Sequence, residues 1–252
     1  MIKAERHERI LGVVARRGAV SIYELSELLD ASSATIRRDL GEMELRHLLR
    51  RTHGGARVPD THDELNFAAK LTSFLPEKRR IGAAAAAYIA TGQTIGCGGG
   101  TTMMQMVKAL KQKSLRIVTT AIDIAMELAN AEQIDVLVTG GQLRRQSCET
   151  VGCIAERTLR DVNLDIAIIG VDGLCPDRGL TTYDLAEAYV NRVLIGRARE
   201  SWIVTDHSKF GVVRPAVIAP ITAISRIFTN TEAPKQALVI LRKAGIKVTV
   251  VR

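Results

Sequence analysis

Residues 32–40 read Ser-Ser-Ala-Thr-Ile-Arg-Arg-Asp-Leu, and this stretch decides how the first part of the chain folds. It follows a short amphipathic segment and the polar turn Asp30-Ala31, and its first residue, Ser32, is of a type that favours helix N-caps. A helix that begins after such a turn is typical of the second helix of a helix-turn-helix, which lies in the DNA major groove. The stretch therefore predicts a DNA-reading element.

The segments on either side complete this pattern. Residues 6–17 carry apolar side chains at helical spacing, and Ser21 with Glu24 forms a capping box for the next helix. After the third helix, residues 48–55 predict a two-stranded wing with a glycine turn. Together these signals predict a winged helix-turn-helix over residues 1–57.

Several polar side chains of this domain are free to face DNA when its apolar stripe is buried. The two helix arginines suit phosphates or guanine edges, and the wing residues suit the flanking DNA backbone. A solvated basic face on an ordinary helical bundle is the alternative, which the spacing of helices, caps and wing disfavours. The predicted DNA-binding residues are Ser33, Thr35, Arg37, Arg38, Arg50, Arg51 and His53.

The composition describes a globular chain without an obvious metal site. Of its 252 residues, 46% are hydrophobic, and the net charge of +8 includes only +3 from residues 1–58 (11 Lys and Arg minus 8 Asp and Glu). Charge alone is therefore weak evidence for a nucleic-acid partner. The four cysteines form no CxxC pair, so we expect no zinc and no cofactor. With no signal peptide and no membrane span in the sequence, we expect a cytoplasmic protein.

From about residue 92, short apolar runs alternate with amphipathic ones. The expected strands are 94–97, 116–119, 135–139, 165–170, 202–205, 226–228 and 247–250, and the expected helices are 102–112, 121–131, 151–160, 184–199 and 234–244. This alternation predicts a largely parallel sheet covered by helices on both faces. We therefore predict an α/β chain in which residues 58–75, with a short helix near 65–73, link the winged helix-turn-helix to an α/β/α domain over 76–252.

The first glycine-rich turn of this second domain is Gly98-Gly99-Gly100-Thr101-Thr102, between an expected strand and an expected helix. Glycines allow close backbone approach, and exposed amides at a helix N-terminus favour an anion such as phosphate. The turn is neither a Walker A loop, which needs a following lysine, nor a GxGxxG fingerprint. A tight turn that binds nothing is the alternative.

Other polar groups also follow expected strands, where ligands bind in open α/β sheets. Asp172 and Glu187 could accept hydrogen bonds from sugar hydroxyls, and Arg144 or Lys209 could pair with a phosphate or carboxylate. A capping Asp, a helix-surface Glu and a surface Arg are open alternatives, and His207 is interpreted as a turn residue rather than a catalytic base. The full set of predicted effector-binding residues is Gly98, Gly99, Gly100, Thr101, Thr102, Gly140, Gly141, Arg144, Asp172, Glu187 and Lys209.

The whole chain resembles the DeoR-type bacterial transcription regulators, including their glycerol-3-phosphate-repressor branch. Each matching piece is weak alone, but the pieces span residues 6 to 211 in the expected order. They are residues 6–10, 34–40, 53–56, 77–78 with 81, 100–102, 140–141 with 143–144, 151–152, 170 with 172–173, 179–182, 187–188, and 206 with 208–211.

The resemblance implies a winged helix-turn-helix joined to an effector domain that looks like the fold of ribose-phosphate isomerases. It implies a repressor of a sugar-catabolic operon, acting as a dimer or tetramer on double-stranded operator DNA. A phosphorylated sugar or sugar alcohol would release it. The resemblance places the phosphate near Thr101, Thr102, Gly140 and Gly141. The resemblance also implies secondary contacts with the effector from Asp172, Glu187, Arg144 and Lys209.

The sequence also departs from the family pattern. Members commonly carry Asp-x-Gly-Thr-Thr-Thr at the first glycine turn, whereas here Gly98 replaces the Asp and Met103 the third Thr. Residues 174–176 lie where the related isomerases tend to have a second acid, and no lysine stands at their usual position before Gly179. The changes at positions 98 and 103 indicate an unusual effector or one held by fewer polar groups. The missing acid and lysine argue against the alternative of a sugar-phosphate isomerase with an accessory DNA-binding domain. An architectural DNA binder with a purely oligomerising second domain is the other alternative.

Overall fold

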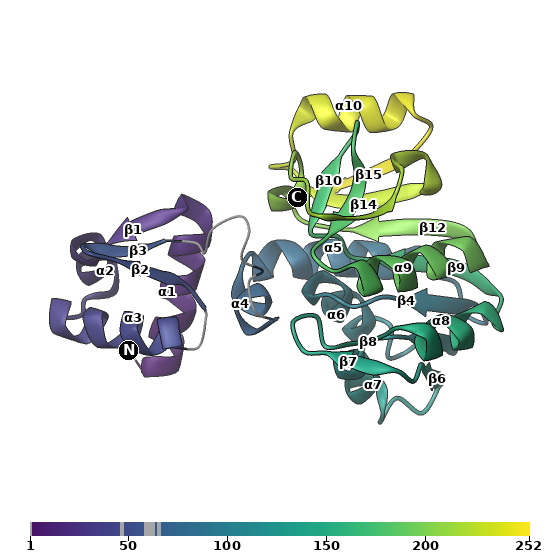
Figure 1. Cartoon of the computed structure of the whole chain (residues 1–252), viewed down its shortest axis with the longest axis horizontal. Helices are drawn as coiled ribbons and strands as arrows, with labels where there is room; N and C mark the ends of the chain where they lie inside the picture. The colour runs from purple at the N-terminus through teal and green to yellow at the C-terminus, as the bar shows by residue number, and fades with distance from the viewer. Residues whose placement is uncertain (1, 46–47, 58–63, 65–66) are drawn as a thin grey trace. The chain divides into compact units, whose positions relative to one another are not determined.

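The structure is a computed structural model that describes residues 2–45, 48–57, 64 and 67–252. The chain forms two compact units, Met1–Leu75 and Pro76–Arg252, and Figure 1 shows the elements of each. Part of the expected linker, residues 58–63 and 65–66, lies outside the described residues. The short helix expected in the linker is α4 (Phe67–Thr72), whose Lys70 pairs with Glu64 at 2.9 Å.

The first unit has the predicted helix order. Its other elements are α1 (Lys3–Arg17), β1 (Ala19–Ser21), α2 (Ile22–Leu29), α3 (Ser33–Leu45), β2 (Arg50–Thr52) and β3 (Gly55–Arg57). The capping box of Ser21 and Glu24 is present, and the Ser32 hydroxyl accepts a hydrogen bond from the Thr35 amide at 3.2 Å. Strand β1 is an addition to the prediction: it pairs with β3, so the wing is a three-stranded sheet in the order β1-β3-β2.

The predicted apolar stripe of α3 is fully buried. Ile36, Leu40 and Met43 each have no exposed surface, and they pack with Ile10 of α1 and Leu25 of α2 in one hydrophobic cluster. This burial turns the opposite, polar face of α3 toward solvent.

An ion-pair cluster ties α3 to α1. Asp39 is 2% exposed, and its carboxylate accepts hydrogen bonds from Arg6 Nε and Nη2 and lies 3.1 Å from His7 Nε2. Burial opposes ionisation of Asp39, but the hydrogen bonds and charge of Arg6 and His7 outweigh it and hold the pKa of Asp39 below its ordinary value. The acid of the Arg-Arg-Asp stretch is therefore a structural residue.

We expect the substitution Asp39→Ala to destabilise the first unit by about 3 kcal/mol, because it removes the buried carboxylate that pairs with the mostly buried guanidinium of Arg6. Hydrogen exchange of the α1 and α3 amides measures this local stability directly. Glu42→Ala, which removes the solvent-accessible ion pair between Glu42 and Lys3, is the matched control and should destabilise the unit much less, because solvent screens that pair. Equal exchange in the two variants would contradict the structural role.

The second unit is built on a seven-stranded sheet whose neighbouring strands pair in parallel. The sheet order is β15-β14-β12-β9-β4-β5-β6, and every one of these strands overlaps an expected strand. In chain order they are β4 (Thr94–Cys97), β5 (Leu115–Thr119), β6 (Ile134–Val138), β9 (Leu164–Ile169), β12 (Ala198–Val204), β14 (Arg226–Asn230) and β15 (Lys247–Val251).

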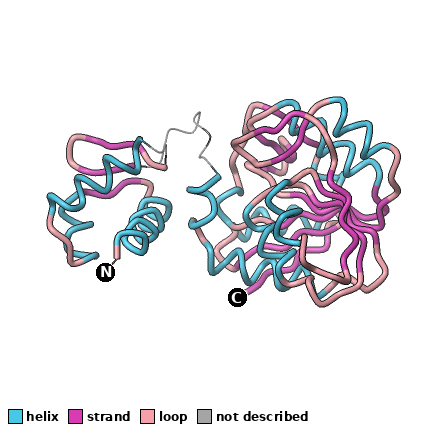
Figure 2. Tube along the Cα trace, turned by 90° about the horizontal axis from the view of Figure 1, so that it is seen from below, coloured by secondary structure: helices cyan, strands magenta, loops and turns pink. Residues whose placement is uncertain are grey.

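Helices cover both faces of this sheet, as the alternation predicts (Figures 1 and 2). Alternate residues of a strand point to opposite faces. Ile166 and Ile168 of β9 join the apolar cluster under α5, α6 and α7, whereas Ala167 and Ile169 join the cluster under α8, α9 and α10. These helices are α5 (Leu75–Ala87), α6 (Thr101–Lys108), α7 (Ile122–Leu128), α8 (Cys153–Arg160), α9 (Leu185–Arg197) and α10 (Lys235–Lys243).

Short strands and 3₁₀ turns complete the second unit and were not predicted from the sequence. The strands are β7 (Gln142–Arg144), β8 (Glu149–Val151), β10 (Gly173–Cys175), β11 (Gly179–Thr182) and β13 (Ala216–Ala219). Strands β7 and β8 form a hairpin, and β10, β11 and β13 form a small antiparallel sheet. Strands of three or four residues show too little alternation to be distinguished from loops. Across the described ranges, no helix has the length and apolar character needed to cross a membrane.

Candidate functional site

The predicted DNA-reading residues of α3 lie on its exposed side. Ser33, Arg37 and Arg38 are exposed, and Thr35 is partly exposed. The Ser32 cap fixes where the helix begins, and the Ser33 hydroxyl lies 3.2 Å from the Ser26 hydroxyl of α2. The first two turns of α3 thus present hydroxyl and guanidinium groups at a helix N-terminus, an arrangement that suits phosphates and base edges.

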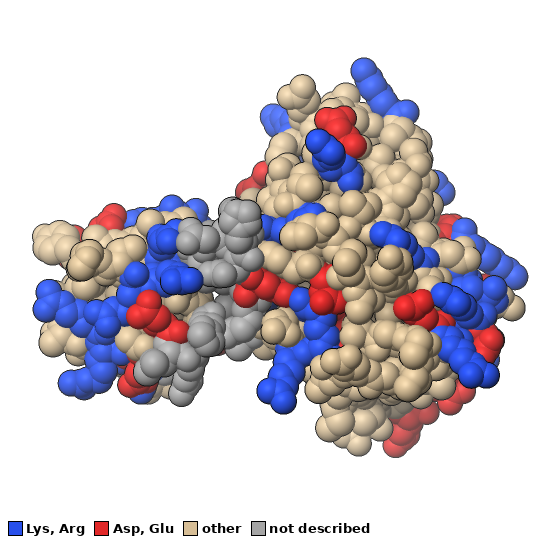
Figure 3. Space-filling model, in the orientation of Figure 1, with Lys and Arg blue, Asp and Glu red and all other residues tan. Residues whose placement is uncertain are grey.

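The wing residues are exposed as well. Arg50 and Arg51 lie on β2, and His53 lies in the turn before β3. The backbone amide of Arg51 donates to Glu44 Oε1 of α3 at 2.9 Å, which joins the wing to the reading helix. Figure 3 shows Lys and Arg side chains interspersed with few acidic ones on the visible face of this unit. The roles of these residues in DNA contact stay a prediction.

The predicted effector residues of the second unit gather at the carboxyl ends of its parallel strands. Strands β4, β5 and β6 follow one another from the middle of the sheet to one edge strand. The next strand of the sheet, β9, lies on the other side of β4, and β12, β14 and β15 continue from it to the opposite edge strand. Ligands in open α/β sheets bind at such a reversal of strand order. The loops after β4 and β9 touch there, because a Cβ on Gly170 would lie 3.1 Å from the carbonyl oxygen of Gly99.

The loop after β4 leads into the start of α6. Gly100, the N-cap of α6, has φ of 123°, a value that side-chain-bearing residues rarely adopt, and among the described residues no side chain caps this helix. Thr101 and Thr102 are each 7% exposed. Helix amides without a side-chain cap and two hydroxyls at one helix N-terminus can hold an anion.

Asn191 of α9 faces the same loop and was missed from the sequence. It is 3% exposed, its Oδ1 has no hydrogen-bond partner within the described ranges, and a Cβ on Gly98 would lie 2.9 Å from that oxygen. A buried carbonyl without a partner is costly unless a donor is supplied. The spacing Glu187 to Asn191 was the available signal, since residues four apart share a helix face.

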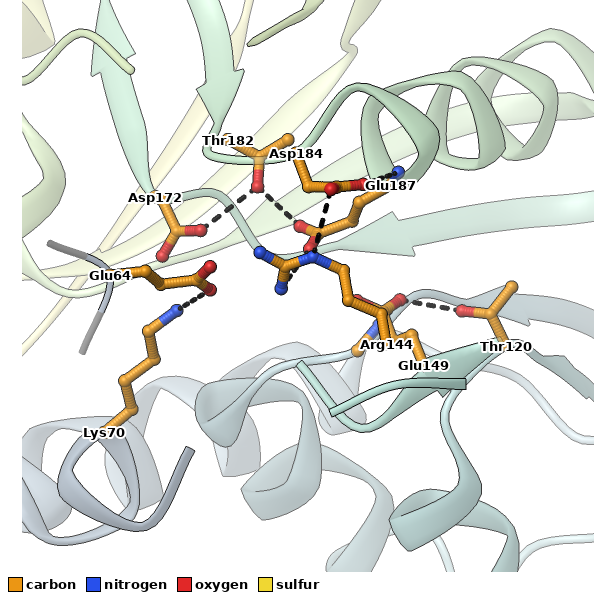
Figure 4. Close-up of polar contacts among 10 residues, drawn as sticks. Glu64, Lys70, Thr120, Arg144, Glu149, Asp172, Thr182, Asp184 and Glu187 are labelled. Carbon is orange, nitrogen blue, oxygen red and sulfur yellow. Dashed lines mark hydrogen bonds and ion pairs between the residues drawn. The ribbon is translucent and has the colours of Figure 1, made fainter. Parts of the chain in front are cut away.

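Arg144 and three acids form a charged cluster beside this loop (Figure 4). The Arg144 guanidinium lies 3.1 Å from Glu187 Oε2 and 3.6 Å from Asp184 Oδ2. The Thr182 hydroxyl is within hydrogen-bond distance of both acids that flank it, 2.6 Å from Glu187 Oε1 and 3.1 Å from Asp172 Oδ2. The predicted residues Arg144, Asp172 and Glu187 are therefore close together, and Glu187 is buried rather than on the helix surface.

Burial, together with the charges of Glu149 and Asp172, raises the pKa of Glu187 to about 8. The folded chain thus keeps a proton on Glu187 at pH values where the unfolded chain has lost it. Between about pH 4.5 and about pH 8 the folded state binds more protons, so the free energy of unfolding falls as pH rises.

We expect Glu187→Gln to flatten this pH dependence, by at most about 1.4 kcal/mol per pH unit. Urea denaturation of the wild-type and variant proteins between pH 5 and pH 8 measures the slope, with Trp202 of the second unit as the fluorescent probe. The difference between the two slopes reports the titration of Glu187 together with the change that its removal causes at Glu149, whose charge acts on it. Parallel slopes would show that Glu187 is ionised throughout this range.

A second buried acid, Glu149, was also missed from the sequence. It lies on β8, is 3% exposed, and its Oε1 accepts hydrogen bonds from the Gly99 amide at 2.6 Å and from the Thr120 hydroxyl at 2.7 Å. Burial raises its pKa, against the opposing effects of these hydrogen bonds and of Arg144. Glu149 belongs to none of the motifs identified in the sequence, and the β7–β8 hairpin that carries it was not predicted.

The remaining predicted residues have separate local roles. Lys209 lies near Asp206, which is 2% exposed. Lys78 of α5, which is 4% exposed and was not among the predicted residues, also lies near Asp206. Burial of Asp206 opposes its ionisation, but the charges of Lys209 and Lys78 prevail and lower its pKa. Gly141 has φ of 127°, and a Cβ there would lie 2.6 Å from the carbonyl oxygen of Val151, so the turn between β6 and β7 requires glycine.

Comparisons with known proteins agree with this architecture. The DeoR-like helix-turn-helix domain matches residues 6–62, and the DeoR C terminal sensor domain matches residues 74–231. The chain is 31% identical to the glycerol-3-phosphate regulon repressor of Escherichia coli K12, covering 96% of each chain. It is 32% identical to the putative aga operon transcriptional repressor of Escherichia coli O157:H7, covering 98% of this chain and 94% of that one.

Among solved structures, ribose 5-phosphate isomerase A of Methanocaldococcus jannaschii is similar over 53% of each chain, with 18% identity and a TM-score of 0.40. The two relatives above are named as repressors rather than enzymes, which disfavours the isomerase alternative. The sensor-domain match covers more than half of the 252 residues, and both relatives exceed 30% identity over nearly the full length. The chain therefore belongs to the DeoR family of DNA-binding transcriptional regulators.

Proposed function

We propose that this regulator represses a carbohydrate-catabolic operon and is released from its operator by a phosphorylated sugar or sugar alcohol. Two relatives are named for repression of the glycerol-3-phosphate regulon and of the aga operon. The observation that supports this proposal most directly is the start of α6 at the reversal of strand order, which no described side chain caps and which has the Asn191 Oδ1 acceptor against the same loop.

In this proposal the phosphate binds the amides of residues 99–102 and the hydroxyls of Thr101 and Thr102, because the Gly98 amide already donates to the Ile168 carbonyl at 3.0 Å. The glycine turn at Gly140 and Gly141 lies at the carboxyl end of β6, on the same edge of the sheet. The sugar hydroxyls would donate hydrogen bonds to carbonyl or carboxylate oxygens, and Arg144 would contact the phosphate or an acidic group. Lys209 supplies additional positive charge after the carboxyl end of β12. The proposed hydroxyl acceptors are Asn191, Asp172 and Glu187.

The coupling of the two events follows from linkage. An effector that binds more tightly to the form with low DNA affinity must lower operator affinity by the same factor. We further propose a homo-oligomer, dimer or tetramer, whose helix-turn-helix units meet half-sites about one helical turn apart or multiples of it. Residues 1–57 would read DNA, 58–75 would connect, and 76–252 would sense the effector and oligomerise.

Fluorescence anisotropy on duplex DNA from the gene's own upstream region tests the proposal, with and without a pooled panel of sugar phosphates. Tight, salt-sensitive binding that the pool releases supports it, and dividing the pool then identifies the effector. Binding that no sugar phosphate disturbs would keep the DNA function and refute the effector class. Where the upstream region binds no better than random DNA, a genome-wide site selection supplies the operator for the same assay.

A further inference from the structure

The carboxylate of Glu149 already occupies part of the anion-binding loop. Its Oε1 accepts from the Gly99 amide at 2.6 Å, one of the amides that the proposed function assigns to phosphate. The same oxygen also accepts a hydrogen bond from the Thr120 hydroxyl at 2.7 Å. A carboxyl group of this chain therefore holds donors that an anionic ligand would use.

The contact is close enough to exclude a second group. A Cβ on Gly99 would lie 2.4 Å from Glu149 Cδ and 2.7 Å from its Oε2, so the carboxyl group rests directly on the loop. A phosphate oxygen cannot approach the Gly99 amide without moving the carboxylate aside or lying against it. On the other side of the loop, buried Asn191 has an Oδ1 that no described residue hydrogen-bonds, which leaves an acceptor for a ligand.

The cation beside Glu149 is already engaged by a second acid. Arg144 of β7 faces Glu149, but it also pairs with Glu187 of α9 at 3.1 Å (Figure 4). Glu187 adds a like charge when it is ionised. Two more titratable groups lie nearby: Cys148, which precedes Glu149 in the chain, and Asp123 of α7, which lies beside Cys148. One guanidinium among several acids does not offset an added phosphate.

We propose that Glu149 is an internal competitor for the anion-binding loop, and that a phosphate group binds with uptake of one proton from solvent by the Glu149 carboxylate. Protonation removes the repulsion between the two groups and leaves the carboxyl able to donate a hydrogen bond to the bound phosphate. Glu149 thereby limits the affinity of the loop for anions and makes it greater at lower pH. This inference rests on the anion site of the proposed function.

Sulfate binding to the full-length protein, measured by isothermal titration calorimetry from about pH 6 to about pH 9, tests the proposal. Sulfate is the probe because phosphate itself gains a proton near pH 6. For the wild-type protein we expect the affinity to fall as pH rises, with proton uptake seen as a dependence of the heat on the buffer. Glu149→Gln keeps an oxygen for Gly99 and Thr120 but has no charge. It should bind sulfate at least about tenfold more tightly at pH 8, with a flatter pH profile.

Two further variants complete the design. Glu149→Ala should show the same change as Glu149→Gln, which covers the case that the glutamine variant folds poorly. Glu132→Gln, an exposed acid between α7 and β6, makes the same change in net charge and should match the wild type.

The outcomes separate this inference from the proposed function. If wild-type and Glu149 variants bind sulfate with one affinity and one pH profile, the competitor role is wrong while the anion site stands. If no variant binds sulfate and no sugar phosphate releases the operator, the anion site is wrong and the role of Glu149 fails with it.

Discussion

The double variant Arg37→Ala, Arg38→Ala is expected to lose specific operator binding while its second unit stays folded. Both side chains are exposed on the first turns of α3, opposite the fully buried stripe of Ile36, Leu40 and Met43. Loss of one arginine contact to a guanine edge costs about 1–3 kcal/mol. Two lost contacts therefore lower the affinity by roughly thirtyfold to ten-thousandfold, which leaves binding near the nonspecific level.

Anisotropy titrations on operator and random duplexes at two salt concentrations measure this loss. If the arginines contact phosphates, the salt dependence of binding also becomes less steep. The matched control is Arg79→Ala, Arg80→Ala, an adjacent pair of exposed arginines on α5 that makes the same change in net charge. Operator affinity that survives in the α3 variant, or falls equally in the control, would contradict the assignment of α3 as the reading helix.

The sequence predicted those parts of the fold whose signals are local. Strands β4 and β9 are short apolar runs because parallel strands are buried on both faces, so their ends could be located to within one residue. Once the strand ends are known, the loops after the carboxyl ends of the strands can be located, and Gly98, Thr101 and Asp172 are predicted to lie in or beside them. The capping box of Ser21 is local too, because both of its hydrogen bonds lie within four residues.

The residues that were missed depend on contacts between distant segments. Glu149 meets Gly99 across 50 positions, and Lys78 meets Asp206 across a greater separation. No spacing rule in one sequence indicates such pairs. The family's usual Asp is absent at position 98, and only the structure gives a physical reason for this. A Cβ there would lie too close to the Asn191 side chain, whose carbonyl oxygen faces the loop.

The second large effect is expected from the double variant Thr101→Val, Thr102→Val, in which operator binding persists but sugar-phosphate release is lost. Valine is close to threonine in shape, and both positions are 7% exposed, so the start of α6 should remain packed. Each hydroxyl that bonds a charged phosphate contributes about 1.5–3 kcal/mol. Losing both raises the effector concentration for half-release by roughly a hundredfold or more.

The anisotropy assay reads both properties of this variant, because operator affinity is measured before the effector is added. Thr158→Val is the matched control: this threonine bonds the Ile154 carbonyl of its own helix, α8, and should leave release unchanged. Weaker operator binding in the α6 variant would point to a folding defect. An unaltered half-release concentration would place the phosphate away from α6, because a dianion held at that helix start cannot avoid the first-turn hydroxyls.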